Sequence, residues 1–201
     1  MPRPPRIFND NVPQHLVNRG NQRAQIFTST QDYLGFIGAM ADAGERTVVR
    51  VVAFCLMPNH WHLVLWPYMG SEISTYMQLL MNSHLRDLVP RHGTSGLGHV
   101  YQGRFKNFSI YNERHFLNVC RYVEANARAA GLVQRAEDWP WCSLSCHGPD
   151  PDINLLSPWP ILRPRNWLDE VNRSLDDVAA HPAPGWVPPE VPATLGASHR
   201  G

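Results

Sequence analysis

The strongest constraint on the fold is a pair of β-type segments separated by only two residues. Residues 47–57 are rich in β-branched and apolar side chains, and residues 60–66 resume the pattern after Pro58-Asn59. A break this short joins neighbouring antiparallel strands, so the two segments predict a β-hairpin. The fold of this chain must therefore contain a sheet built around that hairpin.

Strand and helix patterns alternate on either side of the hairpin. In chain order the sequence predicts a strand over 14–20, a helix over 30–44, the hairpin, a helix over 71–89, a loop over 90–98, a strand over 106–111 and a helix over 113–130. Ser29, Ser71 and Asn112 are the candidate N-caps of the three helices, and Gly131 the stop signal of the last one. This order is a split β-α-β-β-α-β plan with one extra helix. It predicts an α+β fold in which helices flank a ferredoxin-like antiparallel sheet.

Composition divides the chain into three parts. We predict a main domain over 1–148, a Pro-rich docking extension over 149–178 that contains a short helix at about 167–178, and a disordered tail over 179–201. No apolar run is long enough to cross a membrane, so we expect no membrane association. The first residues lack the apolar stretch of a secretion signal, so we expect a cytoplasmic protein.

The net charge of +1 hides an uneven distribution. Residues 1–149 carry 14 Lys and Arg against 10 Asp and Glu, whereas residues 150–201 carry 4 against 7. Every basic residue except Lys106 is arginine, whose planar guanidinium suits phosphate. A GC-rich coding bias would favour arginine equally well, so charge alone leaves the partner open.

His60 and His62 are the first candidate site residues. Both lie in a predicted strand, where side chains two residues apart share a face, while Trp61 between them points to the other face. Two neutral imidazoles on one face can bind one divalent metal ion. The motif is short, and two ordinary sheet histidines remain the alternative.

The helix predicted over 113–130 supplies the second candidate pair. Its core-facing stripe is Phe116, Cys120, Val123 and Ala127. Tyr122 and Asn126 lie one turn apart beside this stripe, where they can face a cleft at the sheet. The Tyr122 hydroxyl could attack a phosphate, and the Asn126 amide oxygen could join the two histidines as a third metal ligand. The alternative is a packing aromatic and a solvated amide.

Several blocks of sequence, taken together, resemble the single-tyrosine (Y1) transposases of the HUH superfamily, which are IS200-like. The blocks are His15–Arg23, Met57–Val64, Val100–Lys106 and Arg121–Asn126, the last continuing through Ala130–Val133 to Trp139–Ser143. The nearest branch is that of the transposases associated with repetitive extragenic palindromes (REP). The resemblance covers about residues 12–147, and Leu155–Asn172 also looks like that branch.

The resemblance implies a metal-dependent enzyme that cuts and rejoins single-stranded DNA beside a hairpin. His60, His62 and Asn126 would hold Mg²⁺ or Mn²⁺, and Tyr122 would form a covalent phosphotyrosine. The expected DNA-binding residues are Arg19, Arg23, Tyr101, Arg104, Phe105 and Lys106. Relatives act as monomers or as homodimers, and the sequence leaves that choice open.

Two departures from the family pattern affect these expectations. Ala127 follows Asn126 where relatives usually have proline, so we expect the helix to continue beyond the candidate ligand. The C-terminal region lacks the basic residues common in the REP branch, which favours a second hypothesis, a hairpin-DNA-binding protein with reduced or lost cleavage. A metal hydrolase acting on small phosphate esters is a third. The Cys142-x3-Cys146-His147 motif hints at zinc but lacks a second half-site.

Overall fold

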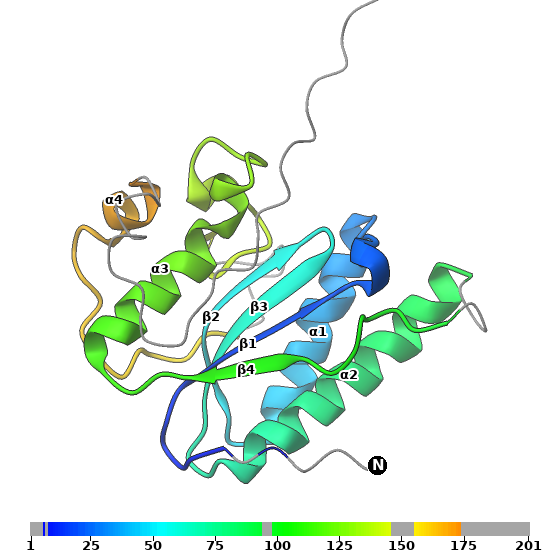
Figure 1. Cartoon of the computed structure of the whole chain (residues 1–201), viewed down its shortest axis with the longest axis horizontal. Coiled ribbons are helices and arrows are strands. Elements are labelled where there is room, and N and C mark those ends of the chain that lie inside the picture. Colours follow the sequence, from blue (N-terminus) through cyan, green and yellow to red (C-terminus); the bar gives the residue numbers. More distant parts are fainter. Residues whose placement is uncertain (1–5, 7, 94–97, 146–154, 174–201) are drawn as a thin grey trace, which may run out of the picture.

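Four strands form one antiparallel sheet in the order β2-β3-β1-β4 (Figure 1). The computed structural model describes residue 6 and residues 8–93, 98–145 and 155–173. The strands are β1 (Gln14–Arg19), β2 (Arg50–Met57), β3 (His60–Trp66) and β4 (Lys106–Ser109). The predicted α+β fold and its hairpin, β2 and β3, are confirmed. Three strands are shorter than expected, because β1 ends at Arg19, β2 begins at Arg50 and β4 ends at Ser109.

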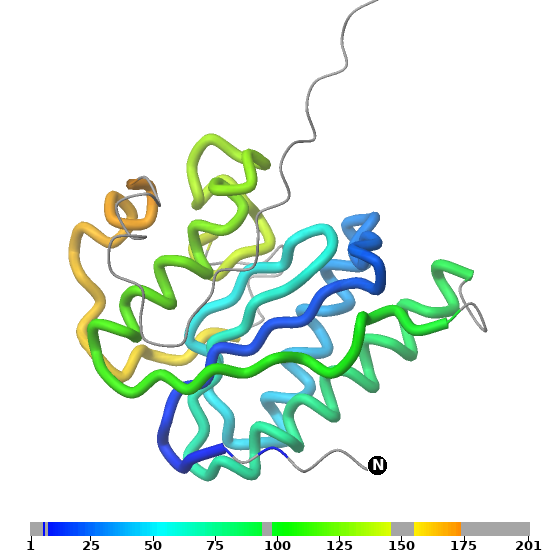
Figure 2. Tube along the Cα trace, in the orientation of Figure 1, coloured from blue at the N-terminus to red at the C-terminus, as the bar shows by residue number. Residues whose placement is uncertain are grey.

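Helices cover both faces of the sheet. α1 (Thr30–Glu45) and α2 (Ser71–Arg91) lie side by side over one face, and α3 (Glu113–Ala129) packs on the other face, mainly on β2 (Figures 1 and 2). The short helix α4 (Trp167–Asn172) lies against α3. Three further turns of 3₁₀ helix, which the sequence did not predict, are η1 (Asn21–Arg23), η2 (Ala136–Asp138) and η3 (Ser143–Ser145).

The sheet is buried on both sides because its side chains alternate between two apolar cores. On β1 and β3, Leu16 and Leu63 point toward α1 and α2 and are fully buried. On the opposite side Val64 packs with Val123 of α3. A register shift in β2 next to Val51 moves its later residues relative to β3. This two-sided burial fixes the register of the central strands β2 and β3, and with it the face on which each of their polar residues lies.

The helix starts follow the predicted capping chemistry at two of three places. Ser29 caps α1 in a reciprocal capping box with Asp32, and Asn112 caps α3 by accepting the backbone N–H of His115. Ser71 is already helical, and Gly70 occupies the N-cap of α2. A Cβ at Gly70 would lie 1.9 Å from a backbone oxygen, so this close approach of two chain segments excludes a side chain there.

The predicted loop at 90–98 begins too early, because α2 continues through Pro90 to Arg91. Proline near the end of a helix removes only one of its last hydrogen bonds. The Arg91 guanidinium also pairs with the buried Asp32 carboxylate at 3.2 Å, which ties the end of α2 to the start of α1. The ion pair between Arg91 and Asp32 therefore outweighs the preference of Pro90 for a loop.

The extension can be described only over residues 155–173, where it lies along α3 with α4 at its end. The predicted boundary at 148, the rest of the helix predicted to 178 and the predicted disordered tail lie outside the described residues. These three expectations stay predictions. Within the described part of the chain, no helix has the length and apolar character needed to cross a membrane.

Candidate active site

Strand β3 presents His60 and His62 on the face that α3 covers. Their ring centroids are 5.1 Å apart and the rings are nearly perpendicular, at 87°. Trp61 between them points into the opposite core and is completely buried. The predicted alternation along this strand therefore places the two imidazoles together.

Helix α3 brings Tyr122 and Asn126 to the same two histidines. The Tyr122 ring centroid lies 5.4 Å from that of His62. Asn126 sits between the imidazoles, with its Oδ1 3.3 Å from His60 Nε2 and its Nδ2 3.4 Å from His62 Nε2. Ala127 lets the helix run on to Ala129, as its helix propensity predicts, and Asn126 keeps helical geometry.

The apolar stripe of α3 is what holds this geometry. Its four predicted members, Phe116, Cys120, Val123 and Ala127, are all buried in the core that α3 shares with β2. The stripe fixes the rotation of the helix about its axis, and this rotation aims the neighbouring row with Tyr122 and Asn126 at β3.

Burial sets the electrostatics of the site. Burial lowers the pKa of His60, and the charge of Arg19 lowers it further. The hydrogen bond to Asn126 acts in the opposite direction and raises this pKa. Burial, together with the neighbouring imidazoles, holds the pKa of His62 well below its usual range. Both rings are therefore neutral at neutral pH, the form that coordinates metal ions. Burial raises the pKa of Tyr122 to about 12, against the hydrogen bond with Asn126.

The donor set fits a divalent cation. His60 Nδ1 lies 2.7 Å from the side-chain oxygen of Asn59, and its Nε2 faces the side-chain oxygen of Asn126 at 3.3 Å. A neutral imidazole has only one N–H, which the shorter contact uses. The Nε2 lone pair of His60 then faces an amide oxygen, an arrangement that a cation between them would stabilise. Two imidazoles and the amide of Asn126 are therefore the candidate ligands.

Three of the predicted DNA-binding residues lie near the histidines. Arg19 is paired with His60 across β1 and β3, so its exposed side chain shares the face of the site. Lys106 is exposed on β4 and is paired with Val17, which puts it on the same face. Arg23 is exposed in η1, and its carbonyl accepts a hydrogen bond from the Asn59 side chain beside His60. Of the three, Arg19 is the cation whose charge acts on His60.

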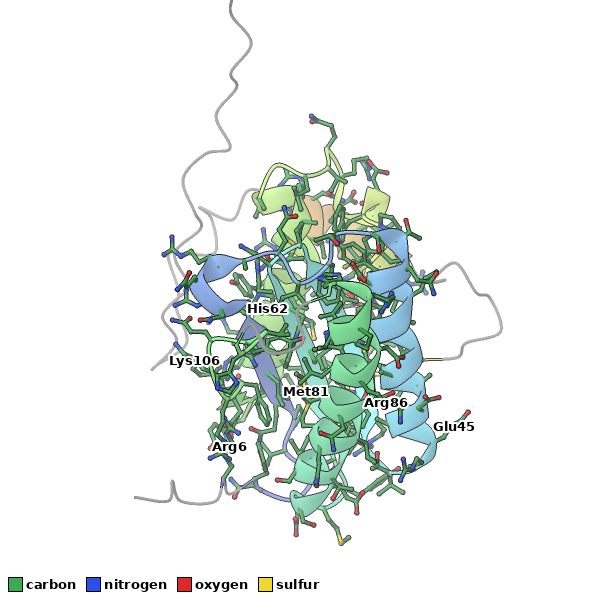
Figure 3. The ribbon with its side chains drawn as sticks, turned by 90° about the vertical axis from the view of Figure 1, so that its right-hand side faces the viewer. Arg6, Glu45, His62, Met81, Arg86 and Lys106 are labelled. Carbon is green, nitrogen blue, oxygen red and sulfur yellow. The ribbon has the colours of Figure 1, made fainter. Side chains whose placement is uncertain are left out.

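The other three lie elsewhere. Arg104 and Phe105 line a cavity of about 570 Å³ between α2 and residues 99–105. Arg6 and Met81, both labelled in Figure 3, also line it. Tyr101 belongs to the core: the residue is 7% exposed, and its hydroxyl accepts a hydrogen bond from Trp61 Nε1 at 3.1 Å. The predicted stacking of Tyr101 on a base would require this ring to leave the core.

His15 is a site residue that the sequence reasoning missed. It is 1% exposed on β1, and its Nε2 lies 2.9 Å from His62 Nδ1. Burial, with a smaller effect of His115, lowers the pKa of His15 to about 4. The strand pattern could have identified His15. Residue 15 points to the face of the sheet opposite Leu16, and this is the face of β3 that carries His60 and His62.

Glu124 was also missed. Its buried carboxylate, on the side of α3 away from the histidines, accepts hydrogen bonds from the Ser143 hydroxyl at 2.7 Å and from Trp167 Nε1, and pairs with Arg163 at 3.2 Å. It thereby fastens the extension to α3. The sequence feature that could have revealed Glu124 is its position four residues after Cys120, where an acid falls inside an otherwise apolar stripe of α3.

The zinc hint stays a prediction, because only Cys142 of its three residues lies in the described part of the chain. Cys142 and Cys55 are buried free cysteines whose backbones form an isolated β-bridge, and buried free thiols pack as small apolar groups. Cys146 and His147 lie outside the described residues.

Comparison with known proteins places the chain in a family. A search of curated proteins finds no match. Among solved structures, that of a REP-associated tyrosine transposase bound to a REP hairpin is 19% identical, with a TM-score of 0.60 over 73% of this chain and 84% of the other. A protein from Deinococcus radiodurans, whose structure is described as that of a transposase, is 18% identical, with a TM-score of 0.42 over 61% of this chain and 95% of the other.

The first of these similarities shows the fold. The family assignment comes from the model of the IS200-like transposases, which matches residues 9–126 and so includes every strand, both histidines, Tyr122 and Asn126. The match spans more than half of the chain and ends on the candidate third ligand. This chain therefore belongs to the family of IS200-like transposases.

Proposed function

We propose that this transposase cuts and rejoins single-stranded DNA through a covalent bond to Tyr122, at a divalent cation site formed by His60, His62 and Asn126. The observation that carries the proposal is the convergence of these four side chains from β3 and α3 of one chain. Because a single chain supplies all four, a monomer would suffice for the chemistry.

The proposed reaction conserves the energy of the phosphodiester. The Tyr122 hydroxyl oxygen loses its proton and bonds to phosphorus, the bond to the 3′ oxygen breaks, and that oxygen takes up a proton to become a 3′-hydroxyl. A second 3′-hydroxyl can reverse the step, so rejoining needs no external energy source. Mg²⁺ or Mn²⁺ bound at the site would act as a Lewis acid for the charge on the phosphoryl oxygens.

The environment of Tyr122 explains why positive charge is needed. A phenol with a pKa of about 12 is almost entirely protonated at neutral pH, and nearby positive charge favours its ionised form. Arg19 and Lys106 lie on the same face of the sheet and can supply part of that charge, while also binding the DNA backbone.

The proposed substrate is single-stranded DNA next to a hairpin. Support comes from the structure of similar fold that is bound to a REP hairpin, which also suggests the REP-associated branch of the family. A single strand is proposed because the scissile phosphate must reach Tyr122 and the two histidines, which lie between α3 and β3.

The test is an adduct assay. Hairpin oligonucleotides with single-stranded flanks are labelled at the 3′ end, because the proposed step leaves the fragment downstream of the cut attached to Tyr122. They are incubated with the protein and Mn²⁺ and run on a denaturing protein gel. We expect a labelled adduct from the wild type and from Tyr68→Phe, an exposed tyrosine far from the histidines, but none from Tyr122→Phe. Binding without an adduct in the wild type would instead support a hairpin-binding protein that has lost cleavage. Hydrolysis of a small phosphate ester that is indifferent to Tyr122→Phe would support a metal hydrolase.

A further inference from the structure

A buried histidine pair lies behind the candidate metal site. His15 and His62 are diagonal neighbours across β1 and β3, and their rings stack with centroids 5.1 Å apart and planes 20° apart. His15 Nε2 is 2.9 Å from His62 Nδ1, a hydrogen-bonding distance. Both side chains are essentially inaccessible to water, at 1% and 0% exposed, so no solvent competes for this contact.

The contact restricts where the protons can be. Two imidazole nitrogens at this distance must share one proton, with one nitrogen donating and the other accepting. The Asn126 amide nitrogen lies 3.4 Å from His62 Nε2, so His62 Nε2 is the acceptor at the site side. The proton of His62 must then be on Nδ1, where it is donated to His15 Nε2.

The second nitrogen of His15 shows that this arrangement has a cost. His15 Nδ1 is buried and has no hydrogen-bond partner within the described residues. A buried unsatisfied donor is destabilising, and an apolar residue at this position would avoid it. The folded chain thus tolerates an unsatisfied group in return for the acceptor that His15 provides to His62.

His60 has a parallel arrangement. Its Nδ1 donates to the side-chain oxygen of Asn59 at 2.7 Å, which leaves its Nε2 directed at Asn126. Each of the two site histidines therefore has an acceptor of its own behind Nδ1, and both Nε2 lone pairs point to the same place.

We propose that His15 is a positioning residue: it accepts the Nδ1–H of His62 and so fixes the tautomer and ring orientation in which His62 Nε2 can bind the cation. The inference rests on the proposed function of the site. An acceptor behind a metal-binding histidine is a general device, and its loss typically weakens metal binding by about 10- to 100-fold.

Three variants separate this role from a packing role. His15→Phe keeps a ring for stacking on His62 but removes the acceptor. His15→Gln removes the ring but offers an amide oxygen that can accept the same hydrogen. His84→Phe is the matched control, because His84 is a second buried histidine, on α2 in the opposite core, with no hydrogen-bond partner among the described residues.

The first measurement is Mn²⁺ affinity, from the electron paramagnetic resonance signal of free Mn²⁺ during titration. We expect His15→Phe to bind Mn²⁺ about 10- to 100-fold more weakly than wild type, and His15→Gln and His84→Phe to stay close to wild type. Wild-type affinity in folded His15→Phe would overturn the proposal. Equal loss in His15→Phe and His15→Gln would also overturn it, because the acceptor would then not be what matters.

The second measurement needs neither a metal nor a variant. Long-range ¹H–¹⁵N spectra of the wild-type protein report which nitrogen of each histidine carries the proton. We expect His62 to be protonated on Nδ1, and protonation on Nε2 would overturn the proposal. If the wild type binds no Mn²⁺, the metal part of the proposed function fails, while these spectra still decide the role assigned to His15.

Discussion

Replacing Asp32 by asparagine should destabilise the protein in a way that depends on pH. The Asp32 carboxylate is 1% exposed at the start of α1. It accepts hydrogen bonds from Thr28, from the backbone N–H of Ser29 and from His92, and it pairs with Arg91 at the end of α2. Asparagine keeps the size of the side chain and one acceptor oxygen but removes the charge, so the variant isolates the charged interactions.

The magnitude follows from the pKa of this carboxyl group. Burial alone would raise it, but the hydrogen bonds from Thr28, His92 and Ser29 outweigh burial and lower the pKa of Asp32 to about 2, from an ordinary value of 3.8. That difference corresponds to about 2.5 kcal/mol of stability. Because the pKa is lowered by folding, this stability is fully present above about pH 5 and is lost as the pH falls toward 2.

The assay is urea unfolding of wild type and Asp32→Asn at several values between pH 7 and pH 2. We expect the variant to be less stable by about 2 kcal/mol at pH 7, with this deficit shrinking to near zero at pH 2. Asp42→Asn is the control, because Asp42 is an exposed carboxylate on the same helix. A deficit that stays constant with pH would refute the reasoning, since the loss would then come from packing and not from charge.

Three further predictions concern stability. Glu124→Leu should lower the free energy of unfolding by about 3–5 kcal/mol, because it leaves without an acceptor the donors that bind the extension to α3. Glu124→Gln should lower it clearly less, and equal losses in urea titrations would contradict this. Tyr101→Phe should cost about 1–2 kcal/mol in the same assay by removing the acceptor of the buried Trp61 N–H, and an unchanged midpoint would argue against that bond. Gly38→Ala, inside α1, should raise the melting temperature, because nothing lies within 4 Å of the added Cβ and alanine favours a helix. Gly20→Ala should lower the melting temperature, because its Cβ would lie 2.1 Å from a backbone oxygen.

Much of the candidate site was predictable because its parts follow local periodicities. The two-residue repeat of a strand puts His60 and His62 on one face, and the apolar stripe of α3 places Tyr122 and Asn126 in one row. What no local pattern contains is the distance between the strand and the helix. The resemblance to the family suggested that the two pairs meet, and the structure shows the contact between Asn126 and both histidines.

The DNA-binding expectations show where this reasoning stops. Tyr101 and Arg104 come from one short block, so the sequence groups them, but the fold buries the first in the core and leaves the second exposed beside a cavity. Exposure depends on the packing of segments far apart in the chain. Arg19 and Lys106 are brought to the face of the site by β1 and β4, whose pairing joins residues about ninety positions apart.

The sequence by itself determined the order of strands and helices, two of the three caps and the face on which each histidine lies, because these depend on neighbours a few residues away. Tertiary structure alone decided that α2 runs through Pro90 to meet Asp32, that His15 stands behind His62 and that Glu124 holds the extension. Each of these depends on two polar groups, distant in sequence, that satisfy each other only when the apolar cores bring them together. Periodicity encodes the faces of the elements, and packing decides which faces meet.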